Sequence, residues 1–113
     1  MDGMIIALPI NDDETLAPFG RAPNVAVVTV AGGEITDWQM HQTEWDVLHD
    51  VGDHGQHHAR MVRFLADNGV QHVVFDHMGQ PMQHVVSKMG IGLHQAGSLQ
   101  AREAARQAAV ALG

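Results

Sequence analysis

The residues best suited to chemistry in this sequence are three histidines within five positions, His54, His57 and His58. His54 and His58 are four residues apart, so on a helix they project from one face, the spacing with which two imidazoles bind one metal ion. Asp53 and Gln56 have the spacing of an N-cap and its capping-box partner, which places the histidines in the first turns of a helix. The positive end of the helix dipole disfavours the imidazolium form, so the rings are biased toward the neutral state that can bind a metal.

A second group follows a predicted strand and consists of Asp76, His77 and Met78. A histidine at a strand end is well placed to be a further ligand, and Asp76 is either a ligand or a partner that fixes the tautomer of a neighbouring imidazole. The alternative for Asp76 is that it caps the next helix. We therefore predict a metal site whose candidate ligands are His54, His57, His58, His77 and Asp76.

Each candidate also has a structural interpretation. His54 and His58 could pack against the sheet in phase with the apolar positions of their helix, with one ring nitrogen hydrogen-bonded. Arg21 could hold an anionic cluster or pair with a carboxylate. Of the other histidines, two are expected to be structural (His72, His84), one is a weaker candidate at the end of the last strand (His94), and two fall in a segment of undecided structure (His41, His49).

Composition limits the function classes. The chain has 113 residues, 45% of them hydrophobic, and a formal charge of −7 with no run of basic residues, which argues against nucleic acid as a partner. It has no cysteine, so disulfides and thiolate ligands are excluded and a metal must be held by His, Asp, Glu, Met or backbone groups. Residues 1–10 lack a basic segment and are too short to span a membrane, so we expect a cytoplasmic protein without membrane contact.

The elements that position these residues follow from periodicity and turn signals. An apolar run predicts a buried first strand, Gly32-Gly33 predicts a hairpin turn, and side chains are expected to alternate along the strand that follows. Residues 11–24 are expected to form a long loop, and 41–52 either a mobile flap or a short helical turn. The predicted strands are 4–9, 25–30, 34–40, 70–75 and 91–93, and the predicted helices are 54–67, 80–89 and 98–112.

This element order predicts one α/β domain over residues 1–113. The expected sheet has five strands in the order 3-2-1-4-5, with strand 2 antiparallel and helices on both faces. The carboxyl ends of strands 1, 3, 4 and 5 then share one rim, where open α/β sheets bind ligands. The long loop, the start of the helix at His54 and the segment after residue 75 all meet there.

Five short motifs resemble one known family in their order and spacing: Ile5-Ile6-Ala7-Leu8-Pro9, Phe19-Gly20-Arg21-Ala22-Pro23, His54-Gly55, Val73 to Gly79, and Gly90-Ile91. Together they resemble the dinitrogenase iron–molybdenum cofactor biosynthesis family over nearly the whole chain. The resemblance implies a three-layer ribonuclease-H-like fold and a small carrier or accessory protein. Its cargo would be a metal–sulfur cluster or precursor of the iron–molybdenum type, exchanged with a cluster donor or acceptor protein. Members are not generally enzymes.

The chain differs from the family pattern in two ways: Pro18 stands where a histidine commonly precedes Phe-Gly-Arg, and extra histidines crowd the rim. Three functions follow from the residues. The first is non-catalytic carriage of a metal ion or metal–sulfur cluster at the histidine-rich rim, with Zn, Ni or Cu as alternative metals. The second is a metal-dependent hydrolase that uses a His-bound water, and the third is a pH-sensing interaction module. An enzyme would need a base beside an open metal position, and only Asp76 is available for that role.

Overall fold

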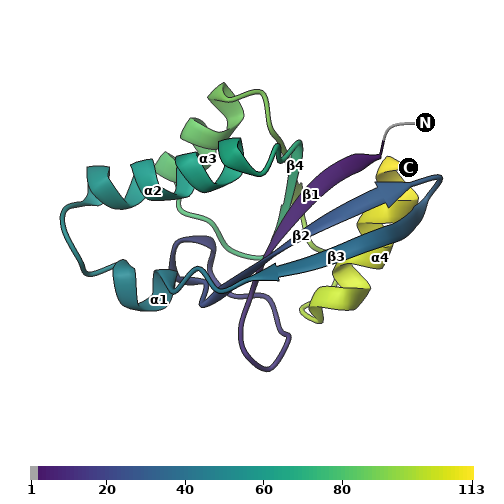
Figure 1. The fold of residues 1–113 in the computed structure, drawn as a ribbon, viewed down its shortest axis with the longest axis horizontal. Helices are drawn as coiled ribbons and strands as arrows, with labels where there is room; N and C mark the ends of the chain where they lie inside the picture. Colours follow the sequence, from purple (N-terminus) through teal and green to yellow (C-terminus); the bar gives the residue numbers. More distant parts are fainter. Residues whose placement is uncertain (1–2) are drawn as a thin grey trace.

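The computed structural model describes residues 3–113, and ten elements of regular structure follow one another along them (Figure 1). Five are strands, four are α-helices and one is a 3₁₀ turn. In chain order they are β1 (Met4–Ile10), η1 (Phe19–Arg21), β2 (Asn24–Ala31), β3 (Glu34–His41), α1 (Trp45–Leu48), α2 (His54–Asp67), β4 (His72–Phe75), α3 (Gln80–Lys88), β5 (Gly92–Gln95) and α4 (Ala101–Leu112).

The strands form one mixed sheet in the order β3-β2-β1-β4-β5, which confirms the predicted fold class. β1 pairs antiparallel with β2 and parallel with β4, and β4 pairs parallel with β5. The central position of β1 explains its continuous apolar sequence, because a strand covered on both faces needs apolar side chains on both. Ile6, Ala7, Leu8 and Ile10 are all completely buried.

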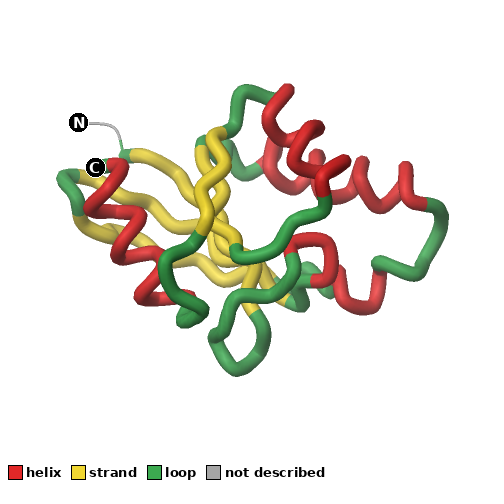
Figure 2. Tube along the Cα trace, turned by 180° about the vertical axis from the view of Figure 1, so that it is seen from behind, coloured by secondary structure: helices red, strands yellow, loops and turns green. Residues whose placement is uncertain are grey.

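Helices cover both faces of this sheet, as Figures 1 and 2 show from opposite sides. α2 and α3 pack on one face, where Met61 and Met82 belong to the same core as the strand residue Val73. α4 packs on the other face through five buried alanines, whose small side chains let the helix lie close to the strands. No helix within residues 3–113 is long and apolar enough to cross a membrane.

The side-chain alternation of one strand and the starts of two elements differ from the sequence expectation. The alternation expected in β3 is broken by an irregular register at Thr29/Val30, so Ile35 and Trp38 both pack toward the core on the α4 side. β4 begins at His72 rather than at residue 70. α4 begins at Ala101 rather than at residue 98, because the Ala101 amide donates to the carbonyl of Glu14 in the long loop and holds the preceding residues extended.

The segment 41–52, undecided from sequence, contains the short helix α1. Trp45 holds this helix in place, with a side chain only 2% exposed. Its ring makes edge contacts with Phe19 and Phe64, at centroid distances of 5.3 and 5.4 Å. The segment therefore packs on the core through one aromatic side chain, and His49 lies near the start of α2.

Candidate metal-binding site

The predicted capping box fixes the start of α2. Asp53 Oδ1 accepts a hydrogen bond of 2.8 Å from the Gln56 amide, and Gln56 Oε1 accepts one of 3.1 Å from the Asp53 amide. Gly52 precedes them with φ of +80°, and a side chain at that position would collide with Gln56. The box therefore places His54, His57 and His58 in the first turns of the helix, as expected.

The turn η1 joins the start of α2 to the end of β4. The Phe19 amide donates to the carbonyl of His77 at 3.0 Å, and the Gly20 carbonyl lies 2.7 Å from His57 Nε2. Residues from three distant parts of the chain are thus held together at the rim of the sheet. The Phe-Gly-Arg motif, noted in the sequence only as a resemblance, has a clear structural role as this link.

His57 is the buried member of the three histidines, with 3% of its surface exposed. Its Nε2 donates to Gly20, and its Nδ1 accepts from Arg60 Nη1 at 2.7 Å. Burial lowers the pKa of His57; the hydrogen bond to Gly20 opposes this shift, and the charge of Arg60 adds to it. Because both nitrogens are occupied, this geometry does not support the ligand role expected for His57, which instead ties α2 to η1.

The other two histidines of the cluster face a shared cavity of about 150 Å³, which we call the rim pocket. It lies between the start of α2 and the start of α3. Its lining residues are Gly20, His49, His54, His57, His58, Met61, Met78, Gly79, Pro81 and Met82. The structure therefore brings four imidazoles and three thioethers to one cavity.

The free donors in the rim pocket are the rings of His54, His58 and His49. Among the described residues, no hydrogen bond is made to the rings of His54 or His58. The ring of His49 lies 6.4 Å from that of His54, centroid to centroid, and its Nδ1 is 3.2 Å from Asp50. Imidazole nitrogen and thioether sulfur are ligand types that suit Fe, Cu, Ni and Zn far better than Mg or Ca.

The remaining predicted ligands lie outside this lining. Asp76 and His77 are exposed at the carboxyl end of β4, on the same rim. The backbone carbonyl of Asp76 accepts from Gln95 Nε2 at 2.8 Å, which ties this end of β4 to β5. Arg21 is exposed next to Gly20, a residue that lines the pocket. None of these three side chains lines the rim pocket.

The rim pocket is not a ready-made site for a single ion. Within residues 3–113, no three or more His, Asp or Glu side chains are arranged so that they could hold one metal ion. A metal–sulfur cluster needs fewer protein ligands, because bridging sulfides already fill most of the coordination positions of its metals.

Sequence reasoning missed four residues of the rim pocket: His49, Met61, Met78 and Met82. The methionines were expected to be core residues, and all three are indeed buried. Two features of the sequence indicate that methionines also line the pocket. Met61 lies four residues after His57, on the same helix face, and Met78 directly follows His77 at a strand end.

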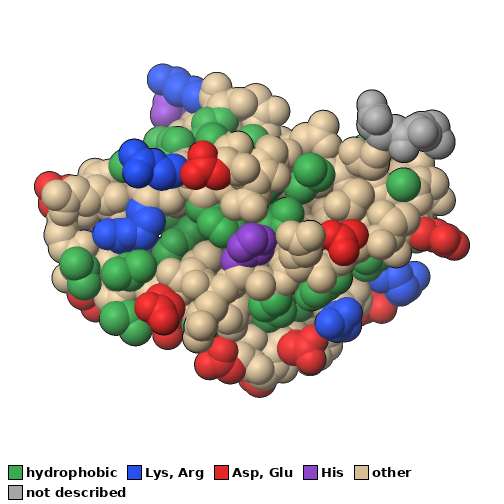
Figure 3. All heavy atoms as spheres, in the orientation of Figure 1, with side chains coloured by type: hydrophobic (Ala, Val, Ile, Leu, Met, Phe, Trp, Pro, Cys, Tyr) green, Lys and Arg blue, Asp and Glu red, His purple; other side chains and the backbone are tan. Residues whose placement is uncertain are grey.

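A second, larger cavity of about 400 Å³ lies along another side of α2 and is bordered by Arg60 and Arg63. Figure 3 shows basic side chains beside hydrophobic ones on this face. Arg60 bridges the two regions, since its Nη1 contacts His57 Nδ1 and also the Leu48 carbonyl at 3.3 Å. The buried His57 is thus held from both sides, by Gly20 and by Arg60.

Sequence comparison finds one family profile over most of the chain. The profile described as dinitrogenase iron-molybdenum cofactor matches residues 3–110. The uncharacterized protein MJ0580 of Methanocaldococcus jannaschii is 27% identical over 94 residues, which are 82% of this chain and 75% of that protein.

Solved structures show the same fold at low identity. The protein PH0822 superposes with a TM-score of 0.73 at 17% identity, over 96% of this chain and 91% of that one. MJ0327 of Methanocaldococcus jannaschii, provisionally assigned as a dinitrogenase, gives 0.72 at 12% identity over 99% and 92% of the two chains. TM1290 of Thermotoga, provisionally assigned as a NifB protein, gives 0.66 at 17% identity over 96% and 86%. At these identities the match establishes the fold alone.

Proposed function

Because this chain belongs to the dinitrogenase iron–molybdenum cofactor family, we propose that it binds and carries a metal–sulfur cluster of the iron–molybdenum type without transforming it. The family description links its members to this cofactor and suggests a role in its biosynthesis or carriage. The cluster is the cargo of the protein and is held in the rim pocket. A cluster donor or acceptor protein is the partner that this role implies.

The observation that carries the proposal is the composition of the rim pocket. Three imidazoles with a free nitrogen, from His49, His54 and His58, face one cavity together with three methionine sulfurs. His54 and His58 stand four residues apart on α2, so both can approach one edge of a cluster. The thioethers offer weak, polarizable contacts to sulfide and metal, which suit a cargo that must later be released.

Electrostatics also favour an anionic cargo at this position, although the whole chain is acidic. The pocket lies at the amino end of the 14-residue helix α2, where the helix dipole is positive. Arg21, exposed beside Gly20, and Arg60, bonded to His57, add positive charge at the rim. We assign Arg21 the role of attracting the anionic cluster to the pocket.

His77 and Asp76 complete the proposed site from outside. Both are exposed at the carboxyl end of β4, and His77 directly precedes Met78, which lines the rim pocket. We propose that His77 supplies a ligand during entry and release of the cluster. The carboxylate of Asp76, the neighbouring residue, then binds metal or orients that imidazole.

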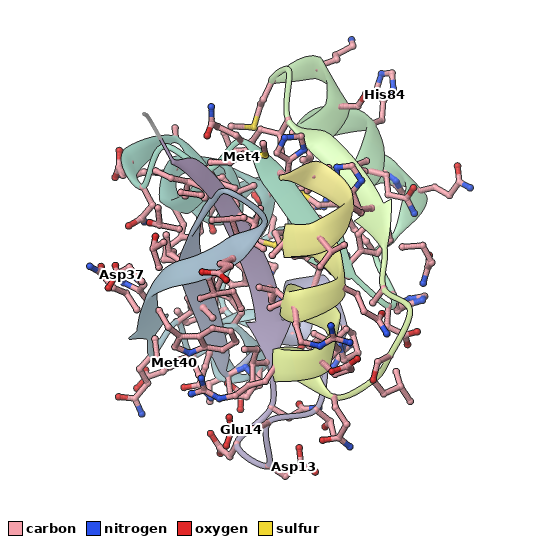
Figure 4. All side chains as sticks on the ribbon, turned by 90° about the vertical axis from the view of Figure 1, so that its right-hand side faces the viewer. Met4, Asp13, Glu14, Asp37, Met40 and His84 are labelled. Carbon is pink, nitrogen blue, oxygen red and sulfur yellow. The ribbon has the colours of Figure 1, made fainter. Side chains whose placement is uncertain are left out.

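Loading under anaerobic conditions tests this function. The untagged protein is incubated with isolated iron–molybdenum cofactor and passed through a desalting column, and iron and molybdenum in the protein fraction are measured. The native chain should retain both metals, and the double variant His54→Ala/His58→Ala should bind the cluster about tenfold more weakly or worse. His84→Ala is the matched control, because His84 is exposed on α3 (Figure 4) and does not line the pocket.

Two results would count against the proposal. One is a native chain that retains neither metal although it is folded. The other is a double variant that retains iron and molybdenum as well as the His84→Ala control does, since the imidazoles of the rim pocket would then have no part in binding.

A further inference from the structure

Two histidines outside the rim pocket face each other across the last two strands of the sheet. His72 on β4 and His94 on β5 approach to 2.8 Å between Nδ1 and Nε2. The strand register pairs His72 with Gly92 and Val74 with His94, so both imidazoles project from one face of the sheet. Val74 packs in the core beneath α4, which identifies that face as the one opposite to α2 and the rim pocket.

Glycine at position 92 provides the room in which the two rings meet. A Cβ atom added at Gly92 would lie 2.5 Å from His72 Nδ1 and 3.0 Å from His94 Nε2. Real Cβ atoms do not approach other atoms so closely, so a larger residue would force the imidazoles apart. The close approach of the two nitrogens therefore depends on three residues together: His72, Gly92 and His94.

The surroundings of His72 disfavour a positive charge on its ring. Both rings are half-buried, and burial followed by the charge of His94 lowers the pKa of His72. No described acidic side chain forms a salt bridge with either ring, since the recorded ion pairs lie elsewhere. At 2.8 Å one of the two facing nitrogens donates a hydrogen bond to the other, and loss of that proton leaves two imidazole nitrogens that can bind one metal ion.

We infer that His72 Nδ1 and His94 Nε2 form a second metal site, which binds a borderline divalent transition-metal ion of the type Ni²⁺, Cu²⁺ or Zn²⁺. Two imidazoles at Zn–N distances near 2.0–2.1 Å in a tetrahedral shell lie roughly 3.3 Å apart, so the nitrogens need to separate by only about half an ångström. Two protein ligands leave the other positions to water. A cavity of about 300 Å³ beside His94, lined also by Gln95 and Gln107, gives solvent access from the α4 side.

A metal ion bound at this site would hold the edge strand β5 to its neighbour β4. β5 is a four-residue strand held to the sheet by β4 alone, and one metal ion bound by both strands would fasten it. A ligand that binds only the folded chain raises its stability by mass action. The inference does not rest on cluster carriage, because the two sites share no residue and lie on opposite faces of the sheet.

The test is a titration with Zn²⁺ in the His54→Ala/His58→Ala background, which removes two imidazoles of the rim pocket. Calorimetry gives the affinity, and NMR of the histidine rings identifies the ligands. We expect one ion to bind, with the ring signals of His72 and His94 shifting together. An added His72→Ala substitution should lower the affinity about tenfold or more, while an added His84→Ala should leave it unchanged.

The Gly92→Ala variant tests whether Zn²⁺ binding requires the close approach of the two rings or only the presence of both histidines. It keeps both imidazoles but places a methyl group where they meet, so Zn²⁺ affinity should again fall about tenfold. Ser87→Ala is its control, because Ser87 is exposed on α3 and lines neither the rim pocket nor the cavity beside His94. The inference is overturned if millimolar Zn²⁺ leaves the ring signals of His72 and His94 unshifted. It is also overturned if His72→Ala and Gly92→Ala, both folded by circular dichroism, bind Zn²⁺ as tightly as their controls.

Discussion

His57 Nε2 donates a hydrogen bond of 2.7 Å to the carbonyl oxygen of Gly20, a residue 37 positions earlier in the chain. This bond attaches the start of α2 to the turn η1, and η1 in turn is bonded to the end of β4 through Phe19 and His77. The rim pocket is built around that junction. His57 is accordingly a positioning residue, and His54 and His58 on either side of it are left free to bind cargo.

Replacing His57 by alanine should destabilise the protein by about 2–4 kcal/mol, because it opens a cavity and leaves the Gly20 carbonyl and Arg60 without their partner. Urea denaturation of the metal-free chain measures the change. His84→Ala, at an exposed position, should change stability by less than about 0.5 kcal/mol. A stable His57→Ala variant that has lost cluster binding would instead make His57 a ligand.

Stability should fall as the pH drops below about 6.5, the ordinary imidazole value. Burial lowers the pKa values of His57 and His72, so below that pH the unfolded chain binds more protons than the folded one. The free energy of unfolding, measured with urea, should therefore be smaller at pH about 5.5 than at about 7.5. Asp13 and Glu103 also have lowered pKa values, but as carboxylates they lose their contributions at more acidic pH. Equal stability at both values would contradict the buried, neutral state of these imidazoles.

Removing the N-cap should affect stability and the site together. Asp53→Ala breaks both bonds of the capping box and should cost about 1 kcal/mol, since the first amides of α2 lose their acceptor. The first turn carries His54, so cluster retention should decline as well. Asp37→Ala on the exposed face of β3 is the control (Figure 4) and should alter neither. Unchanged stability in Asp53→Ala would show that the helix start is held by its other contacts.

Substitutions at Trp45 test how the segment 41–52, which carries His49, is packed on the core. Trp45→Ala should cost about 3–5 kcal/mol, because the buried ring packs between Phe19 and Phe64. Trp45→Phe keeps an aromatic ring and should retain most of the stability. Tryptophan fluorescence would follow the same contact, since the only other tryptophan is Trp38 on β3. A fully stable Trp45→Ala variant would indicate that the segment 41–52 packs independently of this side chain.

Local and periodic features of the fold could be predicted from sequence. The capping box depends on Asp53 and Gln56, three residues apart, and the sheet order follows from the sequence of elements because crossover connections are right-handed. Contacts between residues that are distant in the sequence could not be predicted from local patterns. The bond from His57 to Gly20 uses a backbone carbonyl, which carries no sequence signature.

Helix phase could have identified the buried histidine. His57 shares a face with Met61 and Leu65, four and eight residues later, and both are buried. The structural interpretation of the cluster puts His54 and His58, rather than His57, in phase with that apolar face. The pair His72–His94 was harder to foresee, because it depends on the exact register of β4 and β5, and a shift of one residue would turn either ring to the other face. His72 was accordingly expected to be structural.

The central claim, that imidazoles of the rim pocket bind the cluster, is tested most directly by pulsed electron paramagnetic resonance. The protein is labelled with ¹⁵N-histidine and loaded with isolated iron–molybdenum cofactor in its paramagnetic state. The native chain and His84→Ala should both show a ¹⁵N hyperfine coupling, which should be weaker in His54→Ala/His58→Ala. A loaded native chain without that coupling, or an unchanged coupling in the double variant, would contradict the claim.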